Sequence, residues 1–125
     1  MTEADGPILD EGVLAELTES TGGDIGFVRE LIETYLADTP VQLDAMSAAV
    51  EADDADALVR PAHTLKSSSA TIGAMRLSAV ARELEMAGRT GALEQTVPDR
   101  VDGARVEWTA VEGAFAAWLE RASAE

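Results

Sequence analysis

Apolar residues recur at steps of three and four along most of the chain, and no stretch alternates with a period of two. Steps of three and four place apolar side chains on one face of an α-helix, whereas alternation would indicate a strand. The pattern predicts helices over about 10–19, from 25 onward, 40–52, 54–72, 75–87 and 98–122. Short connections between four substantial helices favour an all-α fold, an antiparallel four-helix bundle with a short extra N-terminal helix.

Capping residues set two of these boundaries. Asp24 precedes the second apolar stretch, and its carboxylate can accept hydrogen bonds from the amides of a first helical turn. Thr39, Pro40 and Gln42 follow in the order typical of a helix start, with a cap, a proline at the first helical position and a reciprocal capping partner. The sequence therefore predicts that a new helix begins at Pro40.

Prolines and glycines punctuate the second half of the chain. Pro61 lacks the amide proton of a helical residue, so a kink is expected there, or a break with a new helix beginning at that point. A kink at Pro61 would either help to present the outer face or merely bend the helix around the core. Gly73 is expected to end the helix, and Gly88 and Gly91 to bracket a turn.

The helix over 54–72 has a clear inner and outer face. At about 100° per residue, its apolar stripe falls within roughly 40° of one direction. The stripe consists of Leu58, Ala62, Leu65, Ser69 and Ile72. His63 lies about 140° from that direction and Lys66 about 80°. The sequence therefore predicts a solvent-facing imidazole, with an ammonium one turn away at the edge of the buried stripe.

Length and charge narrow the function classes. The 125 residues are enough for one domain with a single core, and residues 1–7 are expected to be mobile. A formal charge of −15 argues against nucleic acid or an anionic membrane as a partner, although salt adaptation or a solubility bias would give the same acidity. The chain has no cysteine, no transmembrane run and no signal-peptide pattern, so a cytoplasmic location is expected. The polar exterior favours a monomer.

His63 and Lys66 are the only histidine and the only lysine, and they lie in an acid-free window. Residues 57–82 contain no Asp or Glu, although the chain has 24 of them. Neutral imidazole is a nucleophile that can attack phosphorus, and an ammonium one turn away can balance phosphoryl charge. A zinc site would need further histidines or cysteines, and no glycine-rich phosphate loop follows a strand. A Ser67–His63 hydrolase pair would need a third group to hold the base, and no acid lies near the pair in the sequence.

Residues 62–74, read together with Leu77 and the pair Leu84–Glu85, resemble the histidine phosphotransfer domain of multistep phosphorelays. The run AHTLKSSSATIGA carries the resemblance far more specifically than the His-x-x-Lys core within it. It departs from many members at Ser67, where they have glycine, which bears on how closely a partner's backbone can approach.

The resemblance implies a phosphoryl carrier that is not an autonomous kinase. It implies that Nε2 of His63 takes a phosphoryl group from a receiver-domain aspartate and passes it to another receiver domain, with Lys66 stabilising its charge. The implied partners are response-regulator receiver domains or a hybrid histidine kinase. No cofactor is expected on the chain itself, because the implied Mg²⁺ is held by the receiver. Four residues near His63 are expected docking contacts, namely Val59, Ser67, Ala70 and Thr71.

Two alternatives stay open at this point. The first is a helical interaction module that binds a receiver or a kinase without accepting phosphate. The second is that the sequence is the phosphotransfer part of a larger kinase. A dimerising sensor kinase is disfavoured, because its phosphorylated histidine is typically followed by an acid and Thr64 follows His63 here.

Overall fold

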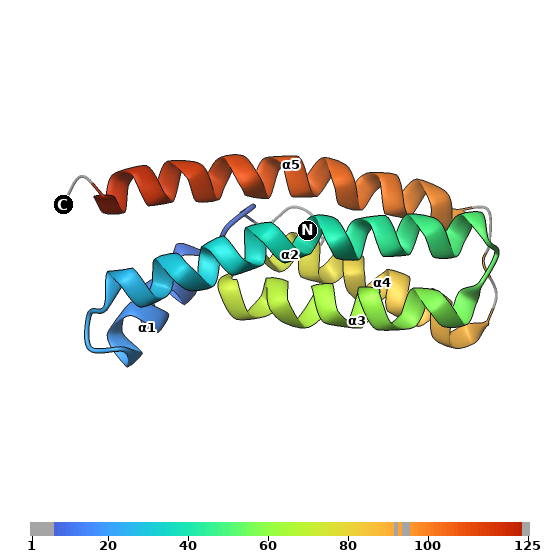
Figure 1. The fold of residues 1–125 in the computed structure, drawn as a ribbon, viewed down its shortest axis with the longest axis horizontal. Coiled ribbons are helices and arrows are strands. Elements are labelled where there is room, and N and C mark those ends of the chain that lie inside the picture. Colours follow the sequence, from blue (N-terminus) through green and yellow to red (C-terminus); the bar gives the residue numbers. More distant parts are fainter. Residues whose placement is uncertain (1–6, 92, 94–95, 124–125) are drawn as a thin grey trace.

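The computed structural model describes residues 7–91, 93 and 96–123, and every regular element in them is a helix. The five helices are α1 (Glu11–Ser20), α2 (Ile25–Glu51), α3 (Ala55–Ile72), α4 (Met75–Thr90) and α5 (Thr96–Ser123). Helices α2–α5 form the four-helix bundle, with α3 in contact with α2 and α4, and α5 in contact with the same two helices (Figure 1). The short helix α1 packs at one end, on α2 and α3. The predicted fold class is confirmed. The mobility expected for residues 1–7 concerns mainly 1–6, which lie outside the described residues.

The helix starts follow from capping carboxylates. Asp10, Asp24 and Asp54 each accept a hydrogen bond from an amide in the first turn of α1, α2 and α3 respectively. This bond satisfies one of the amide donors that a helix start leaves without an intrahelical partner. Asp24 therefore caps as predicted.

The new helix expected at Pro40 does not form, because α2 runs without interruption from Ile25 to Glu51. A proline inside a helix costs about 3 kcal/mol, since it removes one backbone hydrogen bond and crowds the preceding turn. Buried residues recur across the proline at steps of three and four, and this burial offsets the cost. They are Val28, Ile32, Tyr35, Thr39, Leu43, Met46 and Ala49. Thr39 is therefore buried, and its hydroxyl donates to the Tyr35 carbonyl instead of capping a helix.

Helix α3 is also continuous, so the break considered at Pro61 does not occur. Its five predicted stripe residues are all buried, and Gly73 ends it at φ 93°, in the left-handed region that favours glycine. The buried Ser69 hydroxyl lies 2.7 Å from the hydroxyl of Tyr35 on α2. This pairing explains why a polar residue is tolerated in an otherwise apolar stripe. Burial raises the pKa of Tyr35 to about 12, which keeps the phenol neutral.

Helix α4 extends to Thr90, beyond the predicted end at about 87, and Gly88 lies inside it. Gly88 is buried at the contact with α3, where an added Cβ would lie 2.9 Å from the Ala55 carbonyl oxygen. The missing side chain therefore serves the approach of α3 and α4, while Gly91, at φ 78°, ends the helix. Arg89 lies in this extra turn, where its side chain reaches Glu85 of the same helix.

Helix α5 spans the length of the bundle (Figure 1) and begins two residues before the predicted start at Pro98. An apolar stripe along α5 closes the core against α2 and α4. Val101, Ala104, Trp108, Val111 and Phe115 are buried, and Leu119 is half-buried against them. The rings of Trp108 and Phe115 both meet Tyr35 edge-on, with centroids 5.5 and 5.8 Å away. The core thus takes up the inner face of α3, and the outer face of that helix remains exposed to solvent.

Candidate functional site

His63 projects from the outer face of α3, and 53% of its side chain is exposed to solvent. The predicted orientation follows from its neighbours in sequence, because Ala62 and Leu65 occupy the core and turn the intervening positions outward. Lys66 lies one turn further along α3 and is half-buried, with 32% of its side chain exposed. The structure therefore places both predicted reactive residues on one side of α3.

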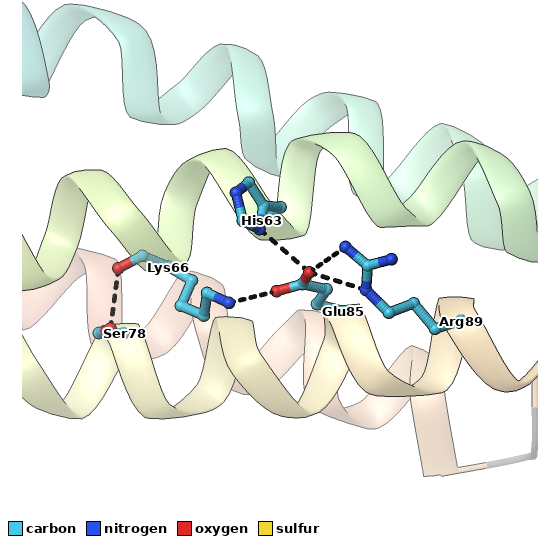
Figure 2. A network of polar contacts seen from close by, with 5 residues as sticks. All are labelled: His63, Lys66, Ser78, Glu85 and Arg89. Atoms are coloured by element: carbon cyan, nitrogen blue, oxygen red, sulfur yellow. Dashed lines mark hydrogen bonds and ion pairs between the residues drawn. The ribbon is translucent and has the colours of Figure 1, made fainter.

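A carboxylate from α4 holds this pair together. The Oε2 atom of Glu85 lies 3.0 Å from Nδ1 of His63, and its Oε1 atom lies 2.7 Å from Nζ of Lys66 (Figure 2). Arg89, one turn later on α4, donates from Nε at 2.9 Å and from Nη2 at 2.7 Å, both to Oε2. Only 6% of the Glu85 side chain is exposed. Four donor nitrogens from three residues thus surround one buried carboxylate, which is the arrangement a buried charge requires.

These donors keep Glu85 ionised. The hydrogen bond from Lys66 is the largest cause that lowers the pKa of Glu85 to about 2, and the bonds from Arg89 and His63 act in the same direction. Burial opposes them by disfavouring the charged carboxylate. The net result is a carboxylate that carries its charge throughout the neutral pH range.

The ionised carboxylate fixes the proton on the imidazole ring. A carboxylate without a proton can only accept hydrogen bonds, so Nδ1 of His63 must be the donor at 3.0 Å. In the neutral ring the lone pair is then on Nε2. Figure 2 shows this second ring nitrogen pointing away from Glu85. The geometry therefore offers solvent one nucleophilic nitrogen and keeps the other occupied.

The α3–α4 hairpin positions these groups. Ser78 of α4 donates a hydrogen bond to the carbonyl oxygen of Lys66 at 2.8 Å, which ties the two helices together beside the site (Figure 2). On the other side of the site, Gly88 lies against Ala55 and Val59 of α3. Glu85 lies between these two contacts along α4, so the register of the hairpin sets its position under the imidazole.

The expected docking residues occupy different environments. Ser67 and Thr71 are exposed and face the same side, since the Thr71 hydroxyl donates to the Ser67 carbonyl at 2.9 Å. Ala70 is half-buried. Val59 is half-buried too and forms part of the contact with Gly88. The structure therefore brings Ser67, Ala70 and Thr71 onto the surface around His63, while Val59 also serves the helix–helix contact.

The acid that contacts His63, Glu85, does not belong to the helix that carries the histidine, so the sequence of α3 does not reveal it. Residues 57–82 contain no acid, but the fold brings Glu85 from α4 to the ring. One signal was available, because Glu85 adjoins the inward positions Ala81, Leu84 and Gly88 in the helical register of α4. Among the described residues, the Ser67 hydroxyl forms no hydrogen bond to the ring that Glu85 contacts.

The described residues hold neither a cluster of metal-binding side chains nor a helix suited to a membrane. No group of three or more histidine, aspartate or glutamate side chains in 7–91, 93 and 96–123 is arranged to hold a metal ion. Over the same ranges, no helix is both long and apolar enough to cross a membrane.

The site is thus an exposed histidine, oriented by a buried carboxylate, on the outer face of a four-helix bundle. The family model of the Hpt domain matches residues 30–125. The crystal structure of histidine-containing phosphotransfer protein B (HptB) from Pseudomonas aeruginosa PAO1 is similar, with a TM-score of 0.82 and 32% sequence identity. The match covers 94% of this chain and 98% of that one. No curated protein sequence matches the chain significantly. The chain belongs to the Hpt domain family, whose members are phosphocarriers in phosphorelays.

Proposed function

We propose that the protein is a phosphorelay intermediate in which Nε2 of His63 accepts a phosphoryl group from one receiver-domain aspartate and delivers it to another. The observation that carries this proposal is the contact between the buried, ionised Glu85 and Nδ1 of His63. It leaves the exposed Nε2 with the lone pair, which a nucleophile needs. Because the contact holds the proton on Nδ1, the same ring can both accept the phosphoryl group on Nε2 and give it up again.

In the accepting step, the Nε2 lone pair attacks the phosphorus of an aspartyl phosphate. The bond between phosphorus and the aspartyl oxygen breaks, and the aspartate leaves with that electron pair as a carboxylate. The proton stays on Nδ1, so the phosphorylated ring becomes positive beside Glu85, whose charge stabilises it. In the donating step, a second aspartate attacks the phosphorus and Nε2 recovers its lone pair.

Lys66 is proposed to stabilise the phosphoryl group. Its ammonium contacts Glu85 at 2.7 Å, and it is close enough in the helix to meet a group on His63, three residues earlier. Arg89 keeps two hydrogen bonds to Glu85, so the carboxylate stays paired if Lys66 turns toward phosphate. Phosphoryl transfer otherwise depends on a metal ion and on positioning. The partner's acidic pocket is proposed to supply Mg²⁺ for this purpose.

The proposed site residues give a direct test. Incubation with phosphorylated receiver domains from the same genome should label the protein with an acid-labile, alkali-stable phosphate, and His63→Gln should remove the label. Alkaline hydrolysis followed by chromatography should find the phosphate on Nε2. A label that persists in His63→Gln would exclude His63. A receiver that binds both proteins equally without labelling either would instead support a pure interaction module.

A further inference from the structure

Two arginines near the site, Arg60 and Arg82, differ from five others in that they form no ion pair with any residue the structure describes. Arg76, Arg89, Arg100, Arg105 and Arg121 each form an ion pair with an acid. Among the described residues, Arg60 and Arg82 are exposed and form no ion pair or hydrogen bond through their side chains. The chain has 24 acidic residues, yet these two exposed guanidinium groups are paired with none of the acids in the described part of the chain, so their charge is available to a partner.

Both arginines lie within one helical turn of the reactive groups. Arg60 precedes His63 by three residues on the exposed side of α3, and residues three apart on a helix are neighbours. Arg82 precedes Glu85 by three residues on α4, and Glu85 contacts the imidazole. The two guanidinium groups therefore come from different helices and bracket the site.

A groove runs from Arg82 to the reactive ammonium. It has a volume of about 360 Å³ and is lined by Lys66, Met75, Ser78, Ala79 and Arg82. The Met75 side chain is 46% exposed and adds an apolar surface beside the two cations. No acid lines this groove.

We propose that Arg60 and Arg82 are docking residues that pair with carboxylates on the receiver domain that exchanges phosphate with His63. This inference rests on the proposed function and adds the chemistry of the contact. A net charge of −15 repels an acidic partner over most of the surface, so attraction is confined to the guanidinium groups that no internal acid neutralises. Guanidinium binds carboxylate through paired hydrogen bonds, which orients the partner as well as attracting it.

The double variant Arg60→Gln/Arg82→Gln tests this docking surface. Glutamine removes the charge and keeps a good helix former. The matched control is Arg100→Gln/Arg121→Gln, which changes the net charge equally at exposed positions of α5. The association rate with a phosphorylated receiver domain from the same genome would be measured by stopped-flow, in low salt and in 1 M salt, alongside labelling of His63.

In low salt the docking variant should associate about tenfold more slowly than the wild type, because charge complementarity acts mainly on the association rate. In 1 M salt, where the Debye length is about 3 Å, the two rates should converge. The control should match the wild type at both salt concentrations. Equal rates for docking variant and wild type in low salt, an equal loss in the control, or a loss that persists in high salt would each overturn the inference. A normal salt response without labelling of His63 would refute the proposed carrier function and leave this docking surface standing.

Discussion

Nδ1 of His63 and Oε2 of Glu85 lie 3.0 Å apart, although the two residues are 22 positions apart in the chain and on different helices. This contact couples the reactivity of an exposed ring to a buried carboxylate. It sets the tautomer of the free protein, so in the proposed function Nε2 would need no rearrangement when a phosphoryl donor docks. The first predictions concern this pair.

Glu85→Gln should slow phosphoryl transfer to His63 by about tenfold to a hundredfold, in line with roughly 1.5–3 kcal/mol for a hydrogen bond to a charged group. A neutral amide can present either its oxygen or its nitrogen to Nδ1, and it gives no charge compensation to the phosphorylated ring. Single-turnover labelling measures the rate. Glu83→Gln is the control, because Glu83 is an exposed acid on the same helix. An unchanged rate in Glu85→Gln would remove the tautomer argument.

Glu85 should also make stability depend on acid. Its pKa is lowered from 4.5 to about 2 in the folded protein, so its contribution to the free energy of unfolding is fully present above about pH 4.5. That contribution is lost as the pH falls from about 4.5 toward 2, and its size is of the order of 1–3 kcal/mol. Urea unfolding of the wild type and Glu85→Gln isolates it from the other acids. The stability gap between them should shrink from pH 6 to pH 3, and a constant gap would contradict the prediction.

Lys66→Gln should affect both the carboxylate and the phosphoryl group. The Lys66 hydrogen bond is the largest cause of the lowered pKa of Glu85, so its loss should raise that pKa and weaken the acid dependence of stability. Transfer to His63 should slow by about tenfold, which corresponds to about 1.4 kcal/mol. Lys66→Arg retains the charge and should recover part of the rate. Rates for Lys66→Gln equal to those of the wild type would restrict Lys66 to its contact with Glu85.

Gly88→Ala should lower the free energy of unfolding by about 1–3 kcal/mol, as overpacking of a close contact does. The new methyl group would lie 2.9 Å from the Ala55 oxygen and from Cγ2 of Val59, so α3 and α4 would have to separate. Gly103→Ala is the matched control, because nothing lies within 4 Å of its added Cβ. The control should gain up to about 1 kcal/mol from helix propensity. Denaturant unfolding compares them, and a stabilised Gly88→Ala would show that the contact is loose.

Gly73→Ala should cost about 2–4 kcal/mol in unfolding free energy, from left-handed strain and a steric clash together. An added Cβ would lie 2.7 Å from the carbonyl oxygen of Asp10, whose amide donates to the Gly73 carbonyl at 2.8 Å. Gly91→Ala carries the strain alone, since its φ is 78° and its surroundings are open. It should lose only about 1 kcal/mol. Equal losses in the two variants would show that Asp10, at the start of α1, can move away from the new methyl group at no cost in free energy.

The inner and outer faces of α3 could be predicted from sequence because they depend only on helical periodicity. The positions of Leu58, Leu65 and Ile72 in the core force His63 outward. The continuity of α2 could not be predicted from local signals, because the start signal at Pro40 is a property of a few residues and burial on both sides outweighs it. The continuous helix is indicated instead by the apolar stripe, which keeps its helical spacing on both sides of Pro40.

Contacts between helices lie beyond such periodicity. Glu85 could be placed on α4 from sequence, but its contact with His63 depends on how closely α3 and α4 approach. That approach depends on Gly88, because a side chain there would clash with α3. From sequence alone, a glycine at this position is indistinguishable from one that marks a turn. The predicted helix ended at about residue 87, one turn too early, so the sequence offered no reason to place Arg89 on α4. The sequence thus predicted which two residues of α3 share the outer side of that helix, while their contacts with Glu85 and Arg89 became visible only in the fold.

The contact at Gly88 has a consequence for how the protein could be rebuilt. Imidazole, carboxylate, ammonium and guanidinium all belong to the segment from Ala55 to Thr90, and the remaining helices contribute none of them. A chimaera that keeps this hairpin and takes its other helices from a different bundle of the same shape would inherit the whole reactive centre. The α3–α4 hairpin thus holds all four side chains of the site, and the other helices pack against it.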